Sequence, residues 1–388
     1  MIAVDARHEC ATETLVQGSC EPDFDRVREA FSANLQIGDD LGASVCVYRY
    51  GRCVVDLSGG WTRAGRPYPQ NSLHVLYSVT KGVVSICLMA LAESGKLDLD
   101  RPVSSYWPEF AENGKERITV RQMLSHQAGL SGFAQTVAIE SFSDWDRTVV
   151  SLASQKPFWP PGAMHGYHAL TFGFLAGELI RRVSGRSASA FLRETFAEPM
   201  DVDVHIGLPA SHAQRVVPLF DAPSSQDLGL ALANAANDPT SLTCNAFNNP
   251  PIDTDVFNRP DVWAMEIPGA NGIGSARGLA ALYSVAVDGP LRGISSATVD
   301  DFRRECVFGP DLVLREQPTR FGAGFMLPCP REPMLTLNSF GHNGRGGSLA
   351  FADPESGVAF AYLGNRCIHD PTPHSRLWRL LSAVRASL

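Results

Sequence analysis

Residues 78–94, SVTKGVVSICLMALAES, are apolar on nearly every face of a helix and are followed by Gly95, a typical helix-ending residue. A helix of this kind has no polar stripe to turn toward water, so other elements must surround it. The 388-residue chain can supply them, because 44% of its residues are hydrophobic and only 19% are charged. This composition is that of a globular protein and excludes a disordered or fibrous chain. The sequence therefore predicts a core built around one buried central helix.

One charged residue, Lys81, lies in the first turn of this apolar helix, among Val79, Val83 and Val84. Burying an ammonium group is costly unless it is partnered, and the positive end of a helix dipole is a further poor place for a cation. Lysine is also rare in this chain, because only four of its 33 basic residues are lysines, at positions 81, 96, 115 and 156. We therefore expect position 81 to require a titratable amine, which arginine cannot supply.

Ser78 lies three residues before Lys81, on the same face of the predicted helix. A neutral lysine beside a serine hydroxyl can activate it as a nucleophile, and the free N–H groups at the helix start can hold an oxyanion. The alternative is that Ser78 caps the helix while Lys81 extends to solvent. The S-x-x-K pattern alone is weak; its position at the start of an apolar helix favours catalysis. If the buried amine is poorly partnered, Lys81→Ala should lose activity without losing stability.

Two further segments carry candidate site residues. Tyr167 follows a Pro-Pro-Gly loop and precedes a helical pattern, and a tyrosine in a cationic setting can titrate low enough to accept a proton. His342, Asn343 and Gly344 precede a strand pair, where glycine allows a substrate to approach the backbone. The alternatives are an aromatic side chain packed under a loop and a simple glycine-rich turn.

The order of the predicted elements suggests how the chain is organised. Strand patterns occur near both ends, and helical patterns occur between them, which predicts one antiparallel sheet built from both termini with an all-helical region inserted. We expect one region from 1–77 plus 270–388, a mostly helical region at 78–269, and a cleft between them. The expected helices are 24–37, 119–125, 143–154, 170–184, 187–197, 275–287 and 374–386; the expected strands are a hairpin at 43–60 and segments 321–327, 346–353 and 357–364; and 223–268 reads as long loops.

Charge and cysteine usage limit the partners and the compartment. A net charge of -8 without a basic stripe argues against nucleic acid as a partner, and no apolar run is long enough to span a membrane. The N-terminal residues do not resemble a secretory signal, so we expect a cytoplasmic protein. The nine cysteines are scattered and odd in number, which indicates reduced thiols, and the histidines form no metal-binding motif. We therefore expect no metal and no cofactor.

Taken in order, these motifs resemble the serine β-lactamase and penicillin-binding-protein superfamily, and in particular the class C β-lactamase-like family VIII carboxylesterases. The resemblance covers about residues 25–385. It includes LYSVTKGVV, GKLDLDRPVSSYWPEF, ITVRQMLSHQAGL, WPPGAMHGYHAL, NGIGSARGLAALYS and FGHNGRGGSLAFADPESG. It implies an α/β (α+β) fold of two regions, in which helices flank an antiparallel sheet and a helical region is inserted, with the site in the cleft.

The resemblance also implies roles for single residues. Ser78 would be the nucleophile, Lys81 its base, and Tyr167 a proton relay that matches the tyrosine of the family's Y-x-N element. His342, Asn343 and Gly344 would replace K-T-G. The oxyanion would be held by the N–H groups of Ser78 and Arg345.

Departures from the family pattern bear on the substrate. Ala169 replaces the asparagine of Y-x-N, and His342, largely neutral at pH 7, replaces the lysine of K-T-G, so two polar partners for a β-lactam are missing. Arg345 is either a replacement cation or a solvated turn residue. Four aromatic residues suggest an apolar acyl pocket, although each also suits the core: Phe133, Phe158, Trp159 and Trp263. His126 and His168 are expected to be structural.

The sequence thus favours a serine acyl hydrolase of the carboxylesterase type that acts on a small, fairly apolar ester through an acyl-enzyme on Ser78. An alternative is an acyltransferase that passes the acyl group to an alcohol or amine, because both reactions use the same residues. A β-lactamase or D-Ala peptidase, and a non-catalytic homologue, are further alternatives. The natural donor and acceptor and the oligomeric state stay open.

Overall fold

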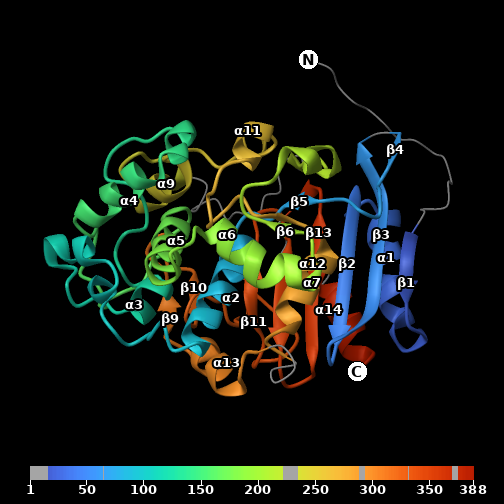
Figure 1. Ribbon diagram of the computed structural model, residues 1–388. Helices are drawn as coiled ribbons and strands as arrows, with labels where there is room; N and C mark the ends of the chain where they lie inside the picture. Colours follow the sequence, from blue (N-terminus) through green and yellow to red (C-terminus); the bar gives the residue numbers. More distant parts are fainter. Residues whose placement is uncertain (1–15, 64, 222–234, 288–292, 331, 369–374) are drawn as a thin grey trace, which may run out of the picture.

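The computed structural model describes residues 16–63, 65–221, 235–287, 293–330, 332–368 and 375–388. Its main sheet is antiparallel and joins strands from both ends of the chain, which Figure 1 shows as blue and red arrows side by side. Val47 of one end pairs with Phe360 of the other. The strand order is β1 (Val16–Cys20), β3 (Arg52–Arg63), β2 (Gly42–Arg49), β13 (Val358–Gly364), β12 (Leu349–Asp353) and β11 (Phe340–Asn343), with β4 (Arg66–Pro67) paired to β3. The predicted antiparallel sheet is confirmed; the region boundaries stay a prediction.

The two faces of this sheet carry side chains of different size, because successive residues of a strand point to opposite faces. On β13, Phe360 and Tyr362 belong to the same apolar cluster as helices α1 (Asp25–Gln36) and α14 (Arg376–Ala386). Ala359 and Ala361 belong instead to the larger cluster that contains helices α2 (Val79–Glu93) and α12 (Ala276–Ser284). Small side chains on this second face let α12 lie directly against the sheet, and α12 in turn supports α2.

Helix α2 is the buried central helix that the sequence predicts. Twelve of its 15 residues are buried. Close packing fixes its position, because a Cβ atom added at Gly82 would lie 1.8 Å from the Tyr283 hydroxyl oxygen of α12. On the side of α2 away from the sheet lie α3 (Val120–Leu124), α4 (Trp145–Ser154) and α5 (Thr171–Ser184) (Figure 1). The chain continues through α6 (Ala188–Leu192), a π-helix (Arg193–Ala197) and α7 (Glu198–Met200).

Several predicted elements differ from the observed ones. The expected strand 321–327 is wrong: β10 (Pro318–Phe321) pairs with β9 (Val307–Pro310) and ends where a glycine-containing turn begins. The expected strand from residue 346 begins only at Leu349, because Gly346 and Gly347 have positive φ values of 85° and 86°. The expected loop 223–268 contains α9 (Leu242–Asn248), α10 (Thr254–Phe257) and α11 (Pro260–Trp263), while 222–234 lies outside the described residues. Helix α13 (Ser296–Arg303) was not predicted.

A small three-stranded sheet contains the strand that directly precedes α2 in the sequence. Its strands are β5 (His74–Val75), β8 (Ile273–Gly274) and β6 (Val204–His205), with β8 in the middle. Elsewhere β7 (Phe220–Asp221) and β14 (Arg366–Cys367) form a parallel pair. Short 3-10 helices occupy Pro22–Phe24, Val103–Ser105, Pro108–Gly114, Ile139–Ser143 and Ala210–Arg215. These small sheets hold the loops that surround the start of α2.

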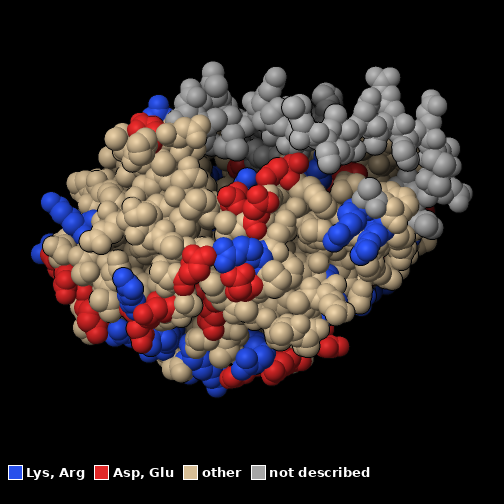
Figure 2. All heavy atoms as spheres, turned by 90° about the horizontal axis from the view of Figure 1, so that it is seen from above, with Lys and Arg blue, Asp and Glu red and all other residues tan. Residues whose placement is uncertain are grey.

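The surface mixes charges of both signs. On the face in Figure 2, basic and acidic side chains lie beside one another. Elsewhere in the described residues, charged side chains form ion pairs, such as Arg121 with Asp100 at 2.6 Å and with Asp301 at 3.0 Å. No helix in the described ranges is long and apolar enough to cross a membrane. The eight described cysteines are free thiols, and Cys10 lies outside the described residues.

Candidate active site

Ser78 lies directly before α2, at its N-cap position, after a constrained turn. Tyr77, the residue before it, has a φ of 45°, an uncommon value for a residue with a side chain. Leu76 donates its N–H to the carbonyl of Gly272 at 2.8 Å, which ties this turn to the segment just before β8. The Ser78 hydroxyl makes no capping hydrogen bond to the helix. Ser78 therefore occupies the N-cap position, but its side chain does not cap the helix and is left for another role.

Lys81 is fully buried and points back toward Ser78. Its Nζ lies 3.0 Å from Ser78 Oγ, 2.7 Å from the carbonyl oxygen of Ala169 and 2.8 Å from that of Gly269. The alternative in which Lys81 extends to solvent is thus wrong, and so is the premise that the amine is poorly partnered. Main-chain carbonyls accept the hydrogen bonds of the amine. Any residue type can offer a main-chain carbonyl, so these partners could not be predicted from the sequence.

The surroundings of Lys81 determine its protonation. Burial lowers the pKa of Lys81 well below the ordinary value of a lysine. A neutral amine has two N–H groups and one lone pair. The carbonyls of Ala169 and Gly269 can only accept hydrogen bonds, so they take the two N–H groups. The lone pair then faces the Ser78 hydroxyl, which is the arrangement of a general base and its nucleophile.

Tyr167 lies beside both Ser78 and Lys81. The Nζ atom of Lys81 is 4.8 Å from the centre of the Tyr167 ring. Burial raises the pKa of the Tyr167 phenol, and a hydrogen bond with Ser78 offsets part of this effect. The expectation that Tyr167 titrates at an unusually low pH is therefore wrong, because the effect of burial outweighs the hydrogen bond that stabilises the phenolate. Tyr167 is a phenol in the resting site, and it can donate a proton.

His342, Asn343 and Gly344 lie at the end of β11 beside this group. The ring of His342 is buried, and its centre lies 6.0 Å from the centre of the Tyr167 ring. Burial is the main cause that lowers the pKa of His342 to about 3. His342 is therefore neutral, as expected. The Asn343 amide donates a hydrogen bond to the carboxylate of Glu332.

The turn after β11 faces the start of α2. We call residues 344–347 the oxyanion turn. A Cβ atom added at Gly344 would lie 2.6 Å from the carbonyl oxygen of Leu76, so this turn packs directly against the residues that precede Ser78. The Gly344 N–H is taken up by the carbonyl of Ser348 at 2.8 Å. Within the described residues, the N–H groups of Ser78 and Arg345 donate to no acceptor, so these two are available to an oxyanion.

A cavity of about 400 Å³ opens over Ser78. Its apolar part includes Tyr77, Phe247, Ile252, Leu314 and Met326, together with Tyr167. Apart from Tyr167, the sequence did not point to these residues. Segments such as α9 and 312–319 reach the site only through the tertiary fold. The expected acyl-pocket residues Phe133 and Trp159 are not among the described residues lining the cavity. Phe133 packs in the core against Phe142, and the Trp159 indole donates to the carbonyl of Met164 at 3.1 Å.

The sequence of the chain matches the Beta-lactamase family over residues 27–384. The chain belongs to this family. It is 33% identical over 370 residues to "Esterase/beta-lactamase LipL" of Mycobacterium tuberculosis, a match that covers 91% of this chain and 83% of the relative. The fold is similar to that of a family VIII carboxylesterase, with a TM-score of 0.87, 36% identity and coverage of 96% of this chain and all of the other. A penicillin-binding protein homologue from Caulobacter crescentus gives a TM-score of 0.84 and 37% identity, with coverage of 97% and 100%.

These similarities confirm the resemblance and the fold that the motifs indicated. The protein is a serine hydrolase of the β-lactamase fold and is esterase-like. Two histidines near the site support its framework, as expected. His168 accepts the Leu130 N–H at 3.0 Å and contacts the Gly166 carbonyl oxygen at 2.7 Å, while His126 accepts the His168 N–H at 3.0 Å.

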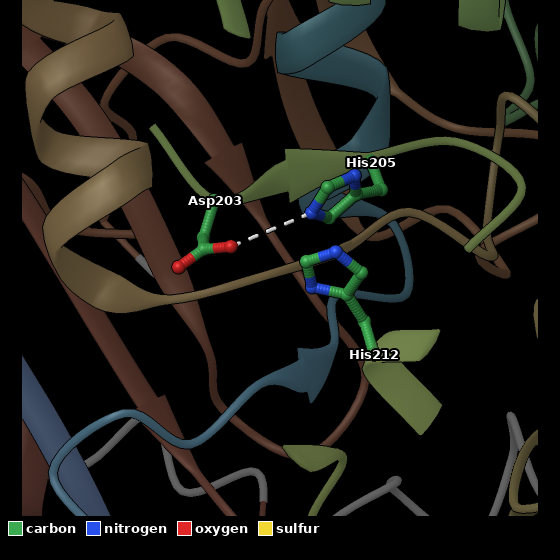
Figure 3. A group of neighbouring side chains, drawn as sticks. All are labelled: Asp203, His205 and His212. Carbon is green, nitrogen blue, oxygen red and sulfur yellow. Dashed lines mark ion pairs between the residues drawn. The ribbon is translucent and has the colours of Figure 1, made fainter. Parts of the chain in front are cut away.

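A group of possible metal ligands lies away from the cavity in this β-lactamase-family fold. Asp203, His205 and His212 place one ligand atom each within 4.8 Å of one another (Figure 3). Arg215 already occupies this group: it donates to both Asp203 oxygens, at 3.0 and 2.7 Å, and contacts His212 Nδ1 at 3.2 Å. A metal ion would have to bind beside this guanidinium, whose positive charge opposes it.

Proposed function

We propose that this protein is a carboxylesterase that hydrolyses small, apolar esters through an acyl-enzyme on Ser78. One observation carries the proposal: the buried Lys81 amine has acceptors for both of its N–H groups and directs its lone pair at the Ser78 hydroxyl, 3.0 Å away. A neutral lysine in this position accepts the serine proton without the aid of a histidine or a metal ion.

Acylation follows from this arrangement. Lys81 takes the hydroxyl proton as Ser78 Oγ attacks the ester carbonyl carbon, and the negative charge that forms on the carbonyl oxygen is held by the N–H groups of Ser78 and Arg345. The new ammonium keeps its hydrogen bonds to the carbonyls of Ala169 and Gly269. When the ester C–O bond breaks, the Lys81–Tyr167 pair returns one proton to the departing alcohol.

Deacylation reverses the direction of proton transfer. A water molecule attacks the acyl carbon and gives one proton to the now neutral Lys81–Tyr167 pair. The bond to Ser78 Oγ breaks, the pair protonates the serine, and a carboxylic acid leaves. The raised pKa of Tyr167 suits this role, because a phenol that keeps its proton can donate it to an alkoxide.

The lining of the cavity supports an apolar acyl or alcohol group rather than a β-lactam. Phe247, Ile252 and Met326 offer apolar surface close to Ser78. Ala169 offers no side-chain amide, and His342 is neutral, so neither provides the polar contacts that a β-lactam amide and carboxylate require.

The test is hydrolysis of p-nitrophenyl butyrate by the purified full chain. Wild type should turn it over, whereas Ser78→Ala should fall by at least about three orders of magnitude. Ser85→Ala is a matched control on the same helix outside the cavity. A fluorophosphonate should label wild type but not Ser78→Ala, and nitrocefin should be a poor substrate. Equal esterase activity in wild type and Ser78→Ala would refute the proposal.

Acyl transfer to an amine is a second candidate that one observation favours. Asp253 and Glu332 line the same cavity, and their carboxylates can accept hydrogen bonds from a neutral amine near the acyl-enzyme and take the proton that it loses as the amide forms. Adding an amine acceptor to the butyrate assay should then yield the amide, measured by mass spectrometry, as a growing share of product. Formation of butyrate alone at every amine concentration would exclude transfer.

A further inference from the structure

We propose that Arg345 is a positioning residue that fixes the oxyanion turn against the wall of the cavity, rather than a free cation for a substrate carboxylate. This inference rests on the proposed function, because it assigns a task to the residue whose N–H is one of the two oxyanion donors. It differs from both interpretations of Arg345 that the sequence left open, a replacement cation and a solvated turn residue.

The Arg345 side chain contacts protein groups at the wall of the cavity. Its guanidinium donates to the carbonyl of Ile252, and Nη2 lies 3.4 Å from Asp221 Oδ1. The central carbon of the guanidinium is 5.9 Å from the centre of the Tyr77 ring. Three separate segments, including the residue before the nucleophile, are thus connected through one side chain.

The partners of Arg345 are themselves held in place. The second carboxylate oxygen of Asp221 accepts the Thr254 hydroxyl at 2.6 Å. Asp253 caps α10 by accepting the Val256 N–H at 2.8 Å, and Ile252, directly before it, lines the cavity. The guanidinium therefore binds a fixed loop, and this can hold the oxyanion turn steady.

The oxyanion turn needs such support because glycine makes its backbone flexible. Gly346 and Gly347 both have positive φ values, and because glycine has no Cβ atom, their backbone can adopt more conformations than that of other residues. The buried guanidinium of Arg376 donates to the carbonyl of Gly346 and, at 3.0 Å, to that of Ile368, which holds the turn from the core side. Arg345 supplies the corresponding contacts on the cavity side.

Because Arg345 forms an ion pair with Asp221, a substrate-binding role and a positioning role for Arg345 predict opposite results. If Arg345 bound a substrate carboxylate, Asp221 would compete with the substrate for the guanidinium, and Asp221→Asn would raise turnover of an anionic ester. If Arg345 positions the turn, Asp221→Asn removes one of its anchors and lowers turnover of every ester. The sign of this one change therefore separates the two roles.

The experiment compares two esters that differ by one carboxylate group, phenyl butyrate and 3-carboxyphenyl butyrate, each normalised to its rate of hydrolysis by hydroxide. Wild type, Arg345→Met, Asp221→Asn and the double variant are assayed for kcat and KM, and their thermal unfolding is measured. Arg385→Met is the matched control, because Arg385 also donates to a main-chain carbonyl, that of Leu335 at 2.6 Å, but outside the cavity.

We expect Arg345→Met to lower kcat by about tenfold or more for both esters, with a change in KM smaller than about twofold, because a displaced donor is lost mainly in the transition state. Asp221→Asn should lower kcat less, and the double variant should be no worse than Arg345→Met. A loss confined to the carboxylate ester, or a gain in its turnover in Asp221→Asn, would overturn the inference. If Arg345→Met does not fold, the direction of the change in turnover in Asp221→Asn distinguishes the two roles of Arg345. Failure of wild type on both esters would instead refute the proposed function.

Discussion

The carboxylate of Asp311 accepts the main-chain N–H of Tyr167 at 3.1 Å, across 144 positions of sequence. The same buried carboxylate also accepts the N–H groups of Val313 and Leu314, each at 2.9 Å, and the Thr319 hydroxyl at 3.1 Å. One side chain thus holds both the proposed proton donor and the segment that forms the opposite wall of the cavity.

Replacing Asp311 should therefore affect stability and catalysis together. Asp311→Ala leaves four donors without their acceptor, so we expect a loss of about 2–5 kcal/mol in the free energy of unfolding, and a fall in kcat of about tenfold. Urea denaturation and butyrate ester assays measure the two effects. Asp353→Ala is the control, because Asp353 holds Thr336, Ser339 and Ser356 in a comparable way outside the cavity. It should lose stability but keep its kcat; an equal fall in kcat would contradict the role given to Asp311.

The pH dependence of kcat/KM should have one acidic limb, set by Lys81. As pH falls through the lowered pKa of Lys81, the amine becomes ammonium and can no longer accept the Ser78 proton, so kcat/KM falls by about one log unit per pH unit. His342, with a pKa of about 3, is already neutral in this range. The pH profile of His342→Gln should therefore keep the same limb, and a limb that disappears in this variant would reassign it to His342.

The close contact between Gly82 and Tyr283 predicts a pair of stability effects. Gly82→Ala places a methyl group 1.8 Å from the Tyr283 hydroxyl oxygen, so we expect a loss of about 1–3 kcal/mol from overpacking. That buried hydroxyl has no hydrogen-bond partner among the described residues, so Tyr283→Phe should be neutral or stabilising. Thermal unfolding of both single variants and of the double variant tests this. A double variant no more stable than Gly82→Ala would show that the clash lies elsewhere.

Truncation of two phenylalanines should have different effects, one on substrate preference and the other on stability. Phe247 lines the cavity, so Phe247→Ala should enlarge it and raise the kcat/KM ratio of octanoate to acetate esters by about tenfold. Phe133 is buried in the core, so Phe133→Ala should lose about 3–5 kcal/mol of stability with no change in this ratio. A change in chain-length preference in Phe133→Ala would restore the original assignment of that residue to the acyl pocket.

Much of the site could be predicted because its chemistry lies in local patterns. The apolar helix made a lysine in its first turn conspicuous, and the spacing of Ser78 and Lys81 brings them together on one helix face. Tyr167 and the His342–Gly344 segment could be assigned to the site because their motifs occur along the chain in the same order as in the family. The alternation of Phe360 and Tyr362 with small alanines likewise follows from the period of a strand.

The sequence by itself thus determined the central helix and the family to which the chain belongs, and it predicted the nucleophile and base. Only the tertiary structure decided what surrounds them: the carbonyls of Ala169 and Gly269 on Lys81, the cavity wall at Phe247, and the ion pair that engages Arg345. The physical reason is that main-chain acceptors have no residue-type signature. Contacts between distant segments depend on how the whole chain packs, which no local period encodes.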